Sequence, residues 1–167
     1  VELVKGFNRN RELKFRDLIK KSRNAILYMN RLDGSVSGEL DSETKKFYKR
    51  GGEFKSIYET EGNFKVKINN KWQNVTKNEL IKLCRKFEKQ GEQVRLTENV
   101  PQIFAVFDGV TVFISLYDEN VPKSERSDII IHNKRFAGFV TEMFELYWDR
   151  SDTLETFARS LVSNKTN

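Results

Sequence analysis

The sequence predicts an α/β domain built around one mixed sheet, and two patterns support this fold class. First, two apolar runs, Gln102–Phe107 and Val110–Leu116, are separated only by Asp108-Gly109. Asp-Gly between β-branched and aromatic runs is a strong hairpin signal, because a type I′ turn needs positive φ at both central residues. Second, helical and extended patterns alternate along the first half of the chain, as they do in an α/β layer.

The predicted hairpin lies within the stretch Glu92–Asp118 and has large apolar groups on both faces. In its second arm, one face carries Val110, Val112, Ile114 and Leu116, and the other carries Thr111, Phe113, Ser115 and Tyr117. A strand that is apolar on both faces is typical of the interior of a sheet. We therefore expect this hairpin to form the middle of the sheet.

The first half of the chain is interpreted as strand, helix, strand, helix, strand. Val1–Val4 is predicted to be a short edge strand, and Asn8 or Asn10 is predicted to cap a helix that ends near Arg23. The side chains of this helix that we expect to face inward are Leu13, Phe15, Leu18 and Ile19. The elements that follow are a buried strand at Ala25–Met29, a loop at Asn30–Gly38, a helix from about Asp41 to Lys49 ended by Gly51-Gly52, and a strand at Glu53–Tyr58.

Residues 61–76 are predicted to be a peripheral insertion that forms a hairpin with an Asn69-Asn70 turn, with an irregular loop as the alternative. Thr76 and Glu79 have the spacing of a capping box and open the next helix. That helix is expected to end at Gly91, and its apolar face carries Leu80, Ile81, Leu83, Cys84 and Phe87. On such a face Cys84 is expected to be an inert core residue rather than a nucleophile.

After the central hairpin the sequence predicts a loop at Asn120–Ser127, a short strand at Asp128–Ile131 and two helices. Asn133 is expected to cap the most amphipathic helix, which runs to about Trp148. Its apolar stripe consists of Phe136, Val140, Met143, Phe144, Tyr147 and Trp148. A last helix at about 152–163, started by Asp152 and Glu155, presents Leu154, Phe157, Ala158, Leu161 and Val162. With no internal repeat and no low-complexity linker, residues 1–167 are interpreted as one domain.

Composition restricts the function classes. The 30 basic and 24 acidic residues give a net charge of +6, and because the signs are interspersed, a solvated surface is favoured over a nucleic-acid footprint. One Cys and one His provide neither a disulfide nor a zinc site, so no metal or cofactor is expected. The sequence has no apolar run near 18 residues and no signal-peptide pattern, which predicts a cytoplasmic protein without membrane insertion. Because Val1 is not a natural start, we expect the chain to be part of a longer protein.

Several catalytic motifs are missing from the sequence. There is no glycine-rich phosphate loop and no G-x-S-x-G motif. His132-Asn133-Lys134 spells H-x-K, the pair that phospholipase-D-type enzymes use, but that motif also needs an Asp five residues after the Lys, where Phe139 stands. We therefore favour a local hydrogen-bonding role for His132.

The central hairpin gives a better match to the same superfamily. It resembles the strand–turn–strand that carries the phospholipase D motif H-x-K-x-x-x-x-D-x-x-x-x-x-x-G-S. With Asp108 as the motif Asp, Pro101 stands at the His position, Ile103 at the Lys position and Ser115-Leu116 at Gly-Ser. Proline cannot attack phosphorus and isoleucine carries no charge, so the resemblance implies a retained framework without its reactive groups.

A closer resemblance covers the chain from about Asn8 to Arg150. The residues that carry this resemblance are Gly91, Val94 and Arg95 before the hairpin, Val100-Pro101, Asp108-Gly109, and Phe144 with Trp148. In these residues the chain resembles the C-terminal domain of TrmB-type transcriptional regulators and their helix-turn-helix relatives. The resemblance implies a phospholipase-D-like mixed sheet with helices on both faces. It also implies a non-catalytic sensor and dimerisation domain that adjusts DNA binding by an attached winged helix. The chain departs from the family in containing no winged helix and in the insertion at 61–76.

Candidate functional residues follow from the expected fold. Ligands of α/β sheets bind at the strand ends, and the candidates there for an unknown small-molecule effector are Tyr28, Asn30, Arg31, Arg95, Thr97, Ser115, Tyr117 and His132. Arg95 is the first choice, because an Arg between two inward residues needs an anionic or carbonyl partner. The candidates for a homodimer interface are Phe136, Met143 and Tyr147. The alternatives are a phosphodiesterase or nuclease using His132 and Lys134, a nucleic-acid-binding module, and a sensor domain of another signalling protein.

Overall fold

The computed structural model describes residues 1–5, 9–31, 42–61, 65–68, 71–116, 118 and 120–164. They form a mixed eight-stranded sheet with the order β1-β9-β8-β7-β2-β3-β6-β10, in which β2, β3 and β6 are parallel. The strands of this sheet are β1 Glu2–Lys5, β2 Ala25–Asn30, β3 Glu53–Glu59, β6 Glu92–Thr97, β7 Phe104–Phe107, β8 Thr111–Leu116, β9 Ser127–His132 and β10 Asp152–Thr153. A mixed sheet with helices on both faces was predicted, and the structure confirms it.

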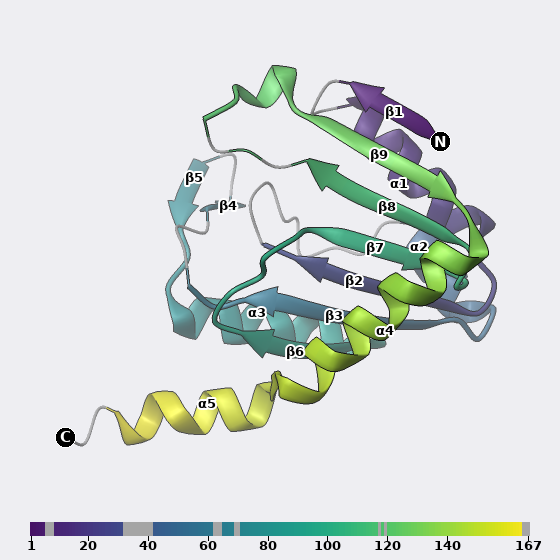
Figure 1. Cartoon of the computed structure of the whole chain (residues 1–167). Helices are drawn as coiled ribbons and strands as arrows, with labels where there is room; N and C mark the ends of the chain where they lie inside the picture. Colours follow the sequence, from purple (N-terminus) through teal and green to yellow (C-terminus); the bar gives the residue numbers. More distant parts are fainter. Residues whose placement is uncertain are drawn as a thin grey trace.

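The helices make two layers around the sheet (Figure 1). One face is covered by α1 Arg9–Lys21, α2 Ser42–Lys49 and α3 Lys77–Lys89, and α4 Lys134–Arg150 crosses the other face diagonally. The last helix, α5 Leu154–Ser163, packs at the β6 edge, and a short 3-10 turn lies at Lys123–Glu125. A separate hairpin, β4 Lys65–Ile68 with β5 Lys71–Asn74, lies at the periphery.

The central hairpin is formed as predicted. Asp108 and Gly109 have φ values of 51° and 65°, the positive values that a type I′ turn requires. The turn joins β7 to β8, which lie fourth and third in the sheet, with β2 beside β7 and β9 beside β8. Val110 and Leu116 were expected to be buried and instead are exposed, because both lie at the ends of the second arm rather than in its middle.

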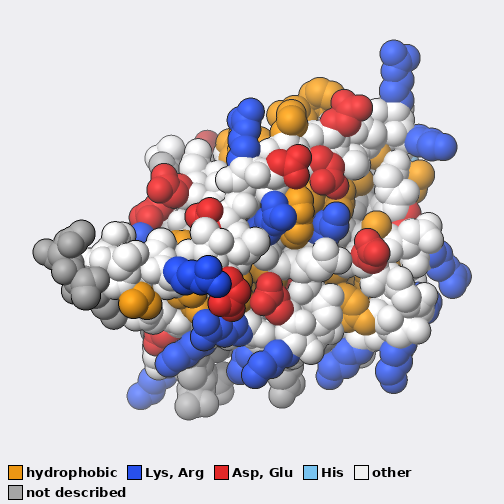
Figure 2. Space-filling view, turned by 90° about the horizontal axis from the view of Figure 1, so that it is seen from below, with side chains coloured by type: hydrophobic (Ala, Val, Ile, Leu, Met, Phe, Trp, Pro, Cys, Tyr) orange, Lys and Arg blue, Asp and Glu red, His pale blue; other side chains and the backbone are white. Residues whose placement is uncertain are grey.

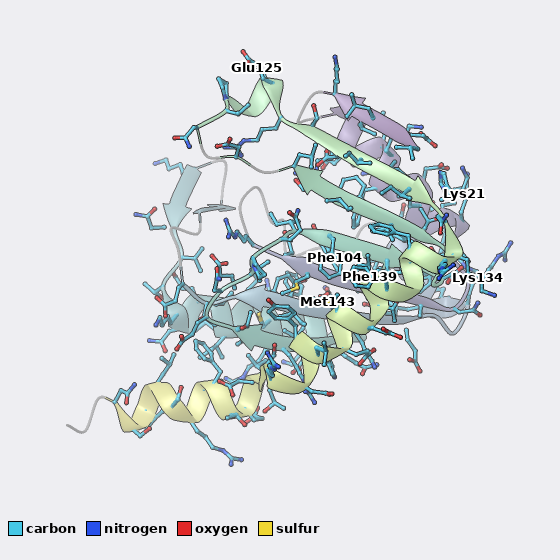
Figure 3. The ribbon with its side chains drawn as sticks, viewed as in Figure 1. Lys21, Phe104, Glu125, Lys134, Phe139 and Met143 are labelled. Carbon is cyan, nitrogen blue, oxygen red and sulfur yellow. The ribbon has the colours of Figure 1, made fainter. Side chains whose placement is uncertain are left out.

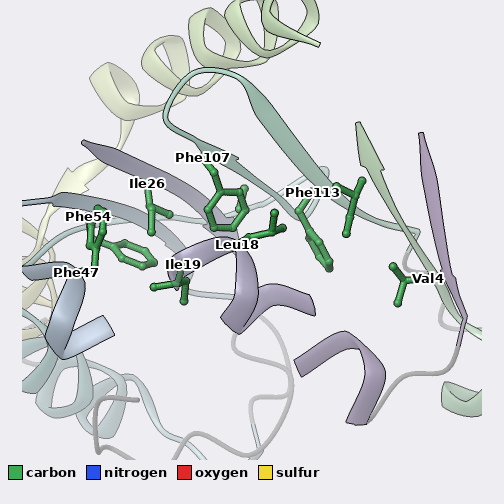
Figure 4. Close-up of a cluster of buried hydrophobic side chains, with 10 residues drawn as sticks. Val4, Leu18, Ile19, Ile26, Phe47, Phe54, Phe107 and Phe113 are labelled. Carbon is green, nitrogen blue, oxygen red and sulfur yellow. The ribbon is translucent and has the colours of Figure 1, made fainter. Parts of the chain in front are cut away.

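Three hydrophobic clusters hold the layers together. Between the sheet and α1 and α2, the ring of Phe15 lies 5.2–5.4 Å from the rings of Tyr28, Phe107 and Phe113, and the buried side chains around it are Val4, Leu18, Ile19, Ile26, Phe47, Phe54, Ala105, Phe107, Phe113 and Ile130 (Figure 4). A second cluster lies under α4, and a third joins α3, α5 and β6. Cys84 is buried in the third, as predicted, and burial raises the pKa of its thiol.

Local signals predicted several termini correctly. Thr76 accepts a hydrogen bond from the Glu79 amide while the Glu79 carboxylate accepts one from the Thr76 amide, which is the predicted capping box. Gly51 follows α2 with φ 82°. Asn133 caps α4 by accepting from the Phe136 amide at 2.9 Å. The predicted hairpin at 61–76 is confirmed by the pairing of Ile68 with Lys71, although its Asn69-Asn70 turn lies outside the described residues.

Five expectations need correction. Asn10 lies inside α1 and therefore cannot be its cap; Asn8 lies outside the described residues. Leu13 is 49% exposed, because it lies outside the i, i+3, i+4 set of Phe15, Leu18 and Ile19. Asp152 does not start the last helix: it pairs with Leu96 in β10, and Thr153 is the cap. The predicted loop at Asn30–Gly38 begins one residue too early, because Asn30 ends β2, and its residues 32–38 lie outside the described residues. In the last helix Val162 is exposed rather than inward.

Candidate functional site

Two charged side chains meet where the parallel strands β2 and β3 end. Arg31 follows β2, and Glu59 is the last residue of β3. Since the strands are parallel neighbours, their carboxyl ends reach the same edge of the sheet. The Nε of Arg31 lies 3.1 Å from Oε2 of Glu59, and Glu59 is only 9% exposed. A carboxylate this shielded from water needs hydrogen-bond partners as well as a counter-charge.

The main chain of Val100 provides those partners. Its carbonyl oxygen accepts from Arg31 Nε at 3.1 Å and from Arg31 Nη2 at 2.7 Å, and its N–H donates to Glu59 Oε2 at 2.6 Å. The N–H of Thr60 donates to the carbonyl oxygen of Thr97 at 2.8 Å, which joins β3 to β6 at the same edge. We call Arg31, Glu59 and Val100 the strand-end clamp, because together they fix the connection from β6 to β7.

This connection leads directly into the central hairpin. Pro101 is exposed, whereas Ile103 is 5% exposed and belongs to the cluster under α4. The Ser115 amide donates to the Ile103 carbonyl oxygen at 3.0 Å, and the Gln102 side chain donates to the carbonyl oxygens of Ile103 and Ser115 at 3.0 and 2.7 Å. Ile103 is therefore joined to the second arm of the hairpin, as the motif comparison requires.

At the other end of the hairpin, the Asp108 carboxylate binds backbone. Its two oxygens accept from the amides of Arg23, Asn24 and Ala25 at 2.8, 2.8 and 3.0 Å. The Asp108 amide in turn donates to the Ala25 carbonyl oxygen at 2.8 Å. Asp108 therefore joins the start of β2 to the hairpin turn, in addition to the turn-forming role predicted for it.

A polar cluster lies on the opposite face of the sheet, under α1. Asp128 is buried, and its Oδ2 lies 3.4 Å from Nε of Arg11. Burial raises the pKa of Asp128, against the opposing effects of Arg11 and of a hydrogen bond from Ser115. Burial also raises the pKa of Tyr28, which is influenced by the charges of Arg11 and Asp128 as well. Ser115 and Tyr28 were predicted site residues, and Arg11 and Asp128 were not.

Arg95 has the carbonyl partner that its position was expected to need. Its Nη1 donates to the carbonyl oxygen of Trp148 at 2.5 Å, and its guanidinium carbon lies 4.6 Å from the centre of the Trp148 ring. Lys55 also lies over this ring, at 5.4 Å. These contacts fasten the end of α4 to β6 and β3.

The structure places the predicted ligand-binding residues in three groups. Arg31, Arg95 and Thr97 project on the α4 side of the sheet, whereas Tyr28, Asn30 and Ser115 project on the α1 side, because successive strand residues alternate between faces. His132 lies at the Asp108 end, where its ring nitrogens are 3.0 Å from Thr111 Oγ1 and 3.1 Å from Glu2 Oε1. Tyr117 lies outside the described residues.

The predicted dimer residues lie along one side of α4. Phe136 and Tyr147 are partly buried against the cluster beneath the helix. Met143 is 37% exposed and lies beside Phe139 and Leu146, which are 57% and 52% exposed. Figure 3 shows Phe139 and Met143 on the outer side of α4, in front of Phe104. With the spacing i, i+4, i+7, the exposed residues Phe139, Met143 and Leu146 form an apolar stripe.

The sequence reasoning missed Glu59 and Val100. A complementary pair of charges, Arg31 and Glu59, lies at the ends of two consecutive predicted strands. In the parallel layer that the alternation of helices and strands predicts, this signal could have found Glu59 if the two strands had been placed side by side. Val100 acts through its backbone, so its side chain gave no signal. Among the described residues, no three His, Cys, Asp or Glu side chains lie close enough to bind a metal ion together. No helix in the described ranges has the length and apolar character needed to span a membrane.

Comparison with known proteins supports the fold. No protein-family model matches the sequence, and no curated protein matches it. Among solved structures, TrmBL2, described as an archaeal chromatin protein with a novel mode of DNA binding, superposes with a TM-score of 0.66 at 21% identity, covering 91% of this chain and 53% of TrmBL2. The chain thus spans about half the length of TrmBL2.

Two bacterial proteins of known structure are also similar to this chain. Nuc from Salmonella typhimurium, a phospholipase D family member, has a TM-score of 0.65 at 15% identity, covering 91% of this chain and 95% of Nuc. NucT from Helicobacter pylori has a TM-score of 0.60 at 13% identity, covering 85% of this chain and 89% of NucT. Identities this low show the fold and not the activity. The chain has a phospholipase-D-like fold.

Proposed function

We propose that this chain is a non-catalytic regulatory domain of a TrmB-like transcriptional regulator. In this role it binds a small-molecule effector, forms a homodimer and adjusts DNA binding by a winged helix outside the chain. The observation that carries the proposal is the hairpin itself: Asp108 keeps its framework contacts, while the positions of the nucleophile and its cationic partner hold Pro101 and Ile103.

The chemistry at these two positions argues against phosphoryl transfer of the phospholipase D type. That reaction needs a nucleophilic side chain and a cation to stabilise the phosphoryl oxygens. Pro101 has no nucleophilic atom, and the Ile103 side chain is packed among apolar residues under α4. At this edge of the sheet, Arg31 and Glu59 contact each other and the main chain of Val100.

Structural similarity is compatible with either role, because regulators and enzymes share this fold. Similarity to TrmBL2 supports the regulatory alternative, and similarity to Nuc and NucT supports the phosphodiesterase alternative. His132 and Lys134 are the residues that the enzymatic alternative would use. His132 lies at the Asp108 end, away from the strand-end clamp, and its ring is hydrogen-bonded to Thr111 and Glu2.

The catalytic question is tested with a chromogenic phosphodiester substrate at high protein concentration. We expect the wild-type protein, His132→Ala and Lys134→Ala to hydrolyse it at the same rate as buffer. A wild-type rate at least tenfold above both variants would replace the regulatory proposal with the phosphodiesterase alternative.

The effector proposal is tested by thermal shift against metabolites that carry phosphate or carboxylate groups, since an Arg pairs with such groups. We expect at least one to raise the melting temperature of the wild-type protein and to lose that effect in Arg95→Ala. An unchanged shift in Arg95→Ala would remove Arg95 from the binding site.

The dimer proposal rests on the exposed apolar stripe of α4. An exposed contiguous apolar surface is typical of an interaction site. We expect Phe139→Ser with Met143→Ser to convert a dimer into a monomer in sedimentation velocity. The matched control is Leu13→Ser, which removes an exposed leucine from α1. The proposal would be contradicted if the wild-type protein remained monomeric at about 100 μM, a concentration at which even a weak dimer should form.

A further inference from the structure

The charge of the protein is divided unevenly between the two helix layers. Together α1, α2 and α3 contain 14 basic and 5 acidic residues, a net charge of +9. On the other face, α4 contains three residues of each sign. The whole chain has a net charge of only +6. The α1–α3 layer therefore holds an excess of positive charge, which the rest of the chain partly cancels. In Figure 2, Lys and Arg side chains line the lower rim, on the side of this layer.

The three helices of this layer end close together. Each immediately precedes one of the parallel strands β2, β3 and β6, so all three run in the same direction. Arg50, just after α2, donates through Nη2 to the carbonyl oxygens of Ile19 and Ser22 at 3.3 and 3.0 Å, at the end of α1. A Cβ at Gly91, just after α3, would lie 3.3 Å from the ring of Tyr48 in α2. The end of α2 therefore adjoins the ends of α1 and α3.

Each helix end carries two lysines in its last turn. These six residues, which we call the lysine row, are Lys20, Lys21, Lys46, Lys49, Lys86 and Lys89. All six are exposed. Lys21 pairs with Asp17 at 2.6 Å and Lys46 with Glu43 at 2.7 Å, and the other four form no ion pair with any residue that the structure describes. Figure 3 shows Lys21 at this end of the molecule.

Complementing the helix macrodipoles explains part of this arrangement. A cation in the last turn stabilises its own helix by about 0.3–1 kcal/mol. That effect fades beyond one turn, yet exposed cations continue into earlier turns at Lys14, Lys45, Lys82 and Arg85. The positive charge is therefore a property of the whole outer surface of the layer.

The chemistry of this surface favours a polyanion with closely spaced charges. Packed helices lie roughly 8–10 Å apart, so three helix ends span roughly 20 Å, over which duplex DNA carries about a dozen phosphates. Among the side chains that the structure describes, Leu13 is the only large apolar one that these helices expose. The surface thus offers no aromatic platform for stacking single-stranded bases and little apolar area for insertion into a lipid surface.

We infer that the α1–α3 layer, with the lysine row at its edge, binds the phosphate backbone of double-stranded nucleic acid without reading its sequence. The contact is made by this domain itself, and it does not depend on the regulatory role proposed above. In such binding, lysines displace the counterions of the duplex, so the affinity falls steeply as salt rises.

The test is fluorescence anisotropy of the protein with a random-sequence duplex across a salt series. The duplex has about 25 base pairs, so that at about 3.4 Å per base pair it is longer than the contact surface. The variant combines Lys20→Gln, Lys49→Gln, Lys86→Gln and Lys89→Gln. The matched control removes four positive charges elsewhere, with Lys5→Gln, Lys71→Gln, Arg150→Gln and Arg159→Gln. We expect the variant to lose about 100-fold in affinity at low salt and the log–log salt slope to decrease by about 3, with the control within about threefold of the wild type.

A second measurement does not depend on variants that fold. Lysine acetylation followed by mass spectrometry should show Lys20, Lys49, Lys86 and Lys89 protected by the duplex, and Lys5 and Lys71 unprotected. The inference is overturned if the wild-type protein does not bind the duplex at low salt, or if both charge variants lose affinity equally. It is also overturned if single strands bind more tightly, or if vesicles of anionic lipid bind and the duplex does not.

Discussion

Glu59 and Asp108 lie at opposite ends of the central strands, and each carboxylate fixes a different junction of the chain. Glu59 pairs with the Arg31 guanidinium and accepts from the Val100 amide. Asp108 takes its three hydrogen bonds from backbone amides at the start of β2. The motif resemblance holds at the Asp108 end, where the side chain shapes the backbone, and fails at the Glu59 end, where reactive groups would be needed.

A third buried carboxylate extends the comparison. Glu92, the first residue of β6, is 8% exposed, and the hydroxyl of Tyr58 donates to it at 2.5 Å. Burial raises the pKa of Glu92, whereas the hydrogen bond from Tyr58 acts to lower it. Glu92 thus differs from Glu59 in having a hydroxyl donor where Glu59 has a guanidinium. Three carboxylates with three kinds of partner should respond differently to neutralisation.

The largest effect is expected for Glu59→Ala. It removes the Glu59 carboxylate from beside Arg31 and leaves the buried Val100 amide without its acceptor, which should cost about 3 kcal/mol of unfolding free energy. The measurement is urea denaturation at neutral pH. The matched control is Glu61→Ala, which breaks the exposed Glu61–Lys77 pair of 2.6 Å and should cost less than about 1 kcal/mol. Equal costs in the two variants would mean that the strand-end clamp contributes no more than a surface pair.

A compensating variant sharpens this result. Replacing both partners of a buried ion pair by apolar residues commonly restores stability, because no unpaired charge remains. Arg31→Met with Glu59→Leu should therefore be more stable than Glu59→Ala alone. If it is less stable, the hydrogen bonds to Val100 matter more than the charges.

Asp108→Asn should have an intermediate effect. Asparagine tolerates the positive φ of this position, so the turn is kept, but one carboxylate oxygen becomes an amide nitrogen that cannot accept from a backbone N–H. A loss of about 1–2 kcal/mol is expected from the unpaired amide and the weaker acceptor. Asp149→Asn, an exposed change at the end of α4, is the control and should be nearly neutral. An unchanged midpoint for Asp108→Asn would show that the turn, and not the carboxylate, fixes the start of β2.

The sequence predicted those parts of the fold that depend on near neighbours. The Asp108-Gly109 turn, the Thr76 capping box and the Asn133 cap each need residues within three positions. The strand-end clamp joins pairs of residues that are separated in the sequence by 28, 41 and 69 positions. Their contacts follow from the order of the strands. Arg95 shows the difference between local and long-range prediction. Its need for a carbonyl partner was predicted, but its partner Trp148, 53 residues away, could be identified only from the position of α4.

The lysine row shows the same difference between local and long-range prediction for the distribution of charge. Along the sequence the cations are interspersed with acids, which favoured a solvated surface. Three helices that run in one direction on one face bring their last turns together, and the excess of charge then belongs to a surface rather than to a segment. The topology of the parallel strands β2, β3 and β6 was the missing information.

Glu92→Gln should have the smallest effect and the opposite sign. The raised pKa means that the folded state holds a proton on Glu92 more tightly than the unfolded state does. The stability due to this proton is therefore fully present below the unfolded pKa and is lost as the pH rises through the folded pKa. A neutral Gln keeps an acceptor for the Tyr58 hydroxyl and carries no charge to bury, so the variant should become more stable than the wild type as the pH increases.

The expected direction of this change is tested by urea denaturation between about pH 4 and pH 7. This range begins near the ordinary pKa of a glutamate and extends about three pH units above it. The difference between Glu92→Gln and the wild type should grow with pH across the lower part of the range and then level off. Glu53→Gln, an exposed change on the neighbouring strand β3, should show no such dependence. If Glu92→Gln is instead destabilising at neutral pH, the charged carboxylate must be favoured by its hydroxyl donor over burial, and the distinction between Glu92 and Glu59 would disappear.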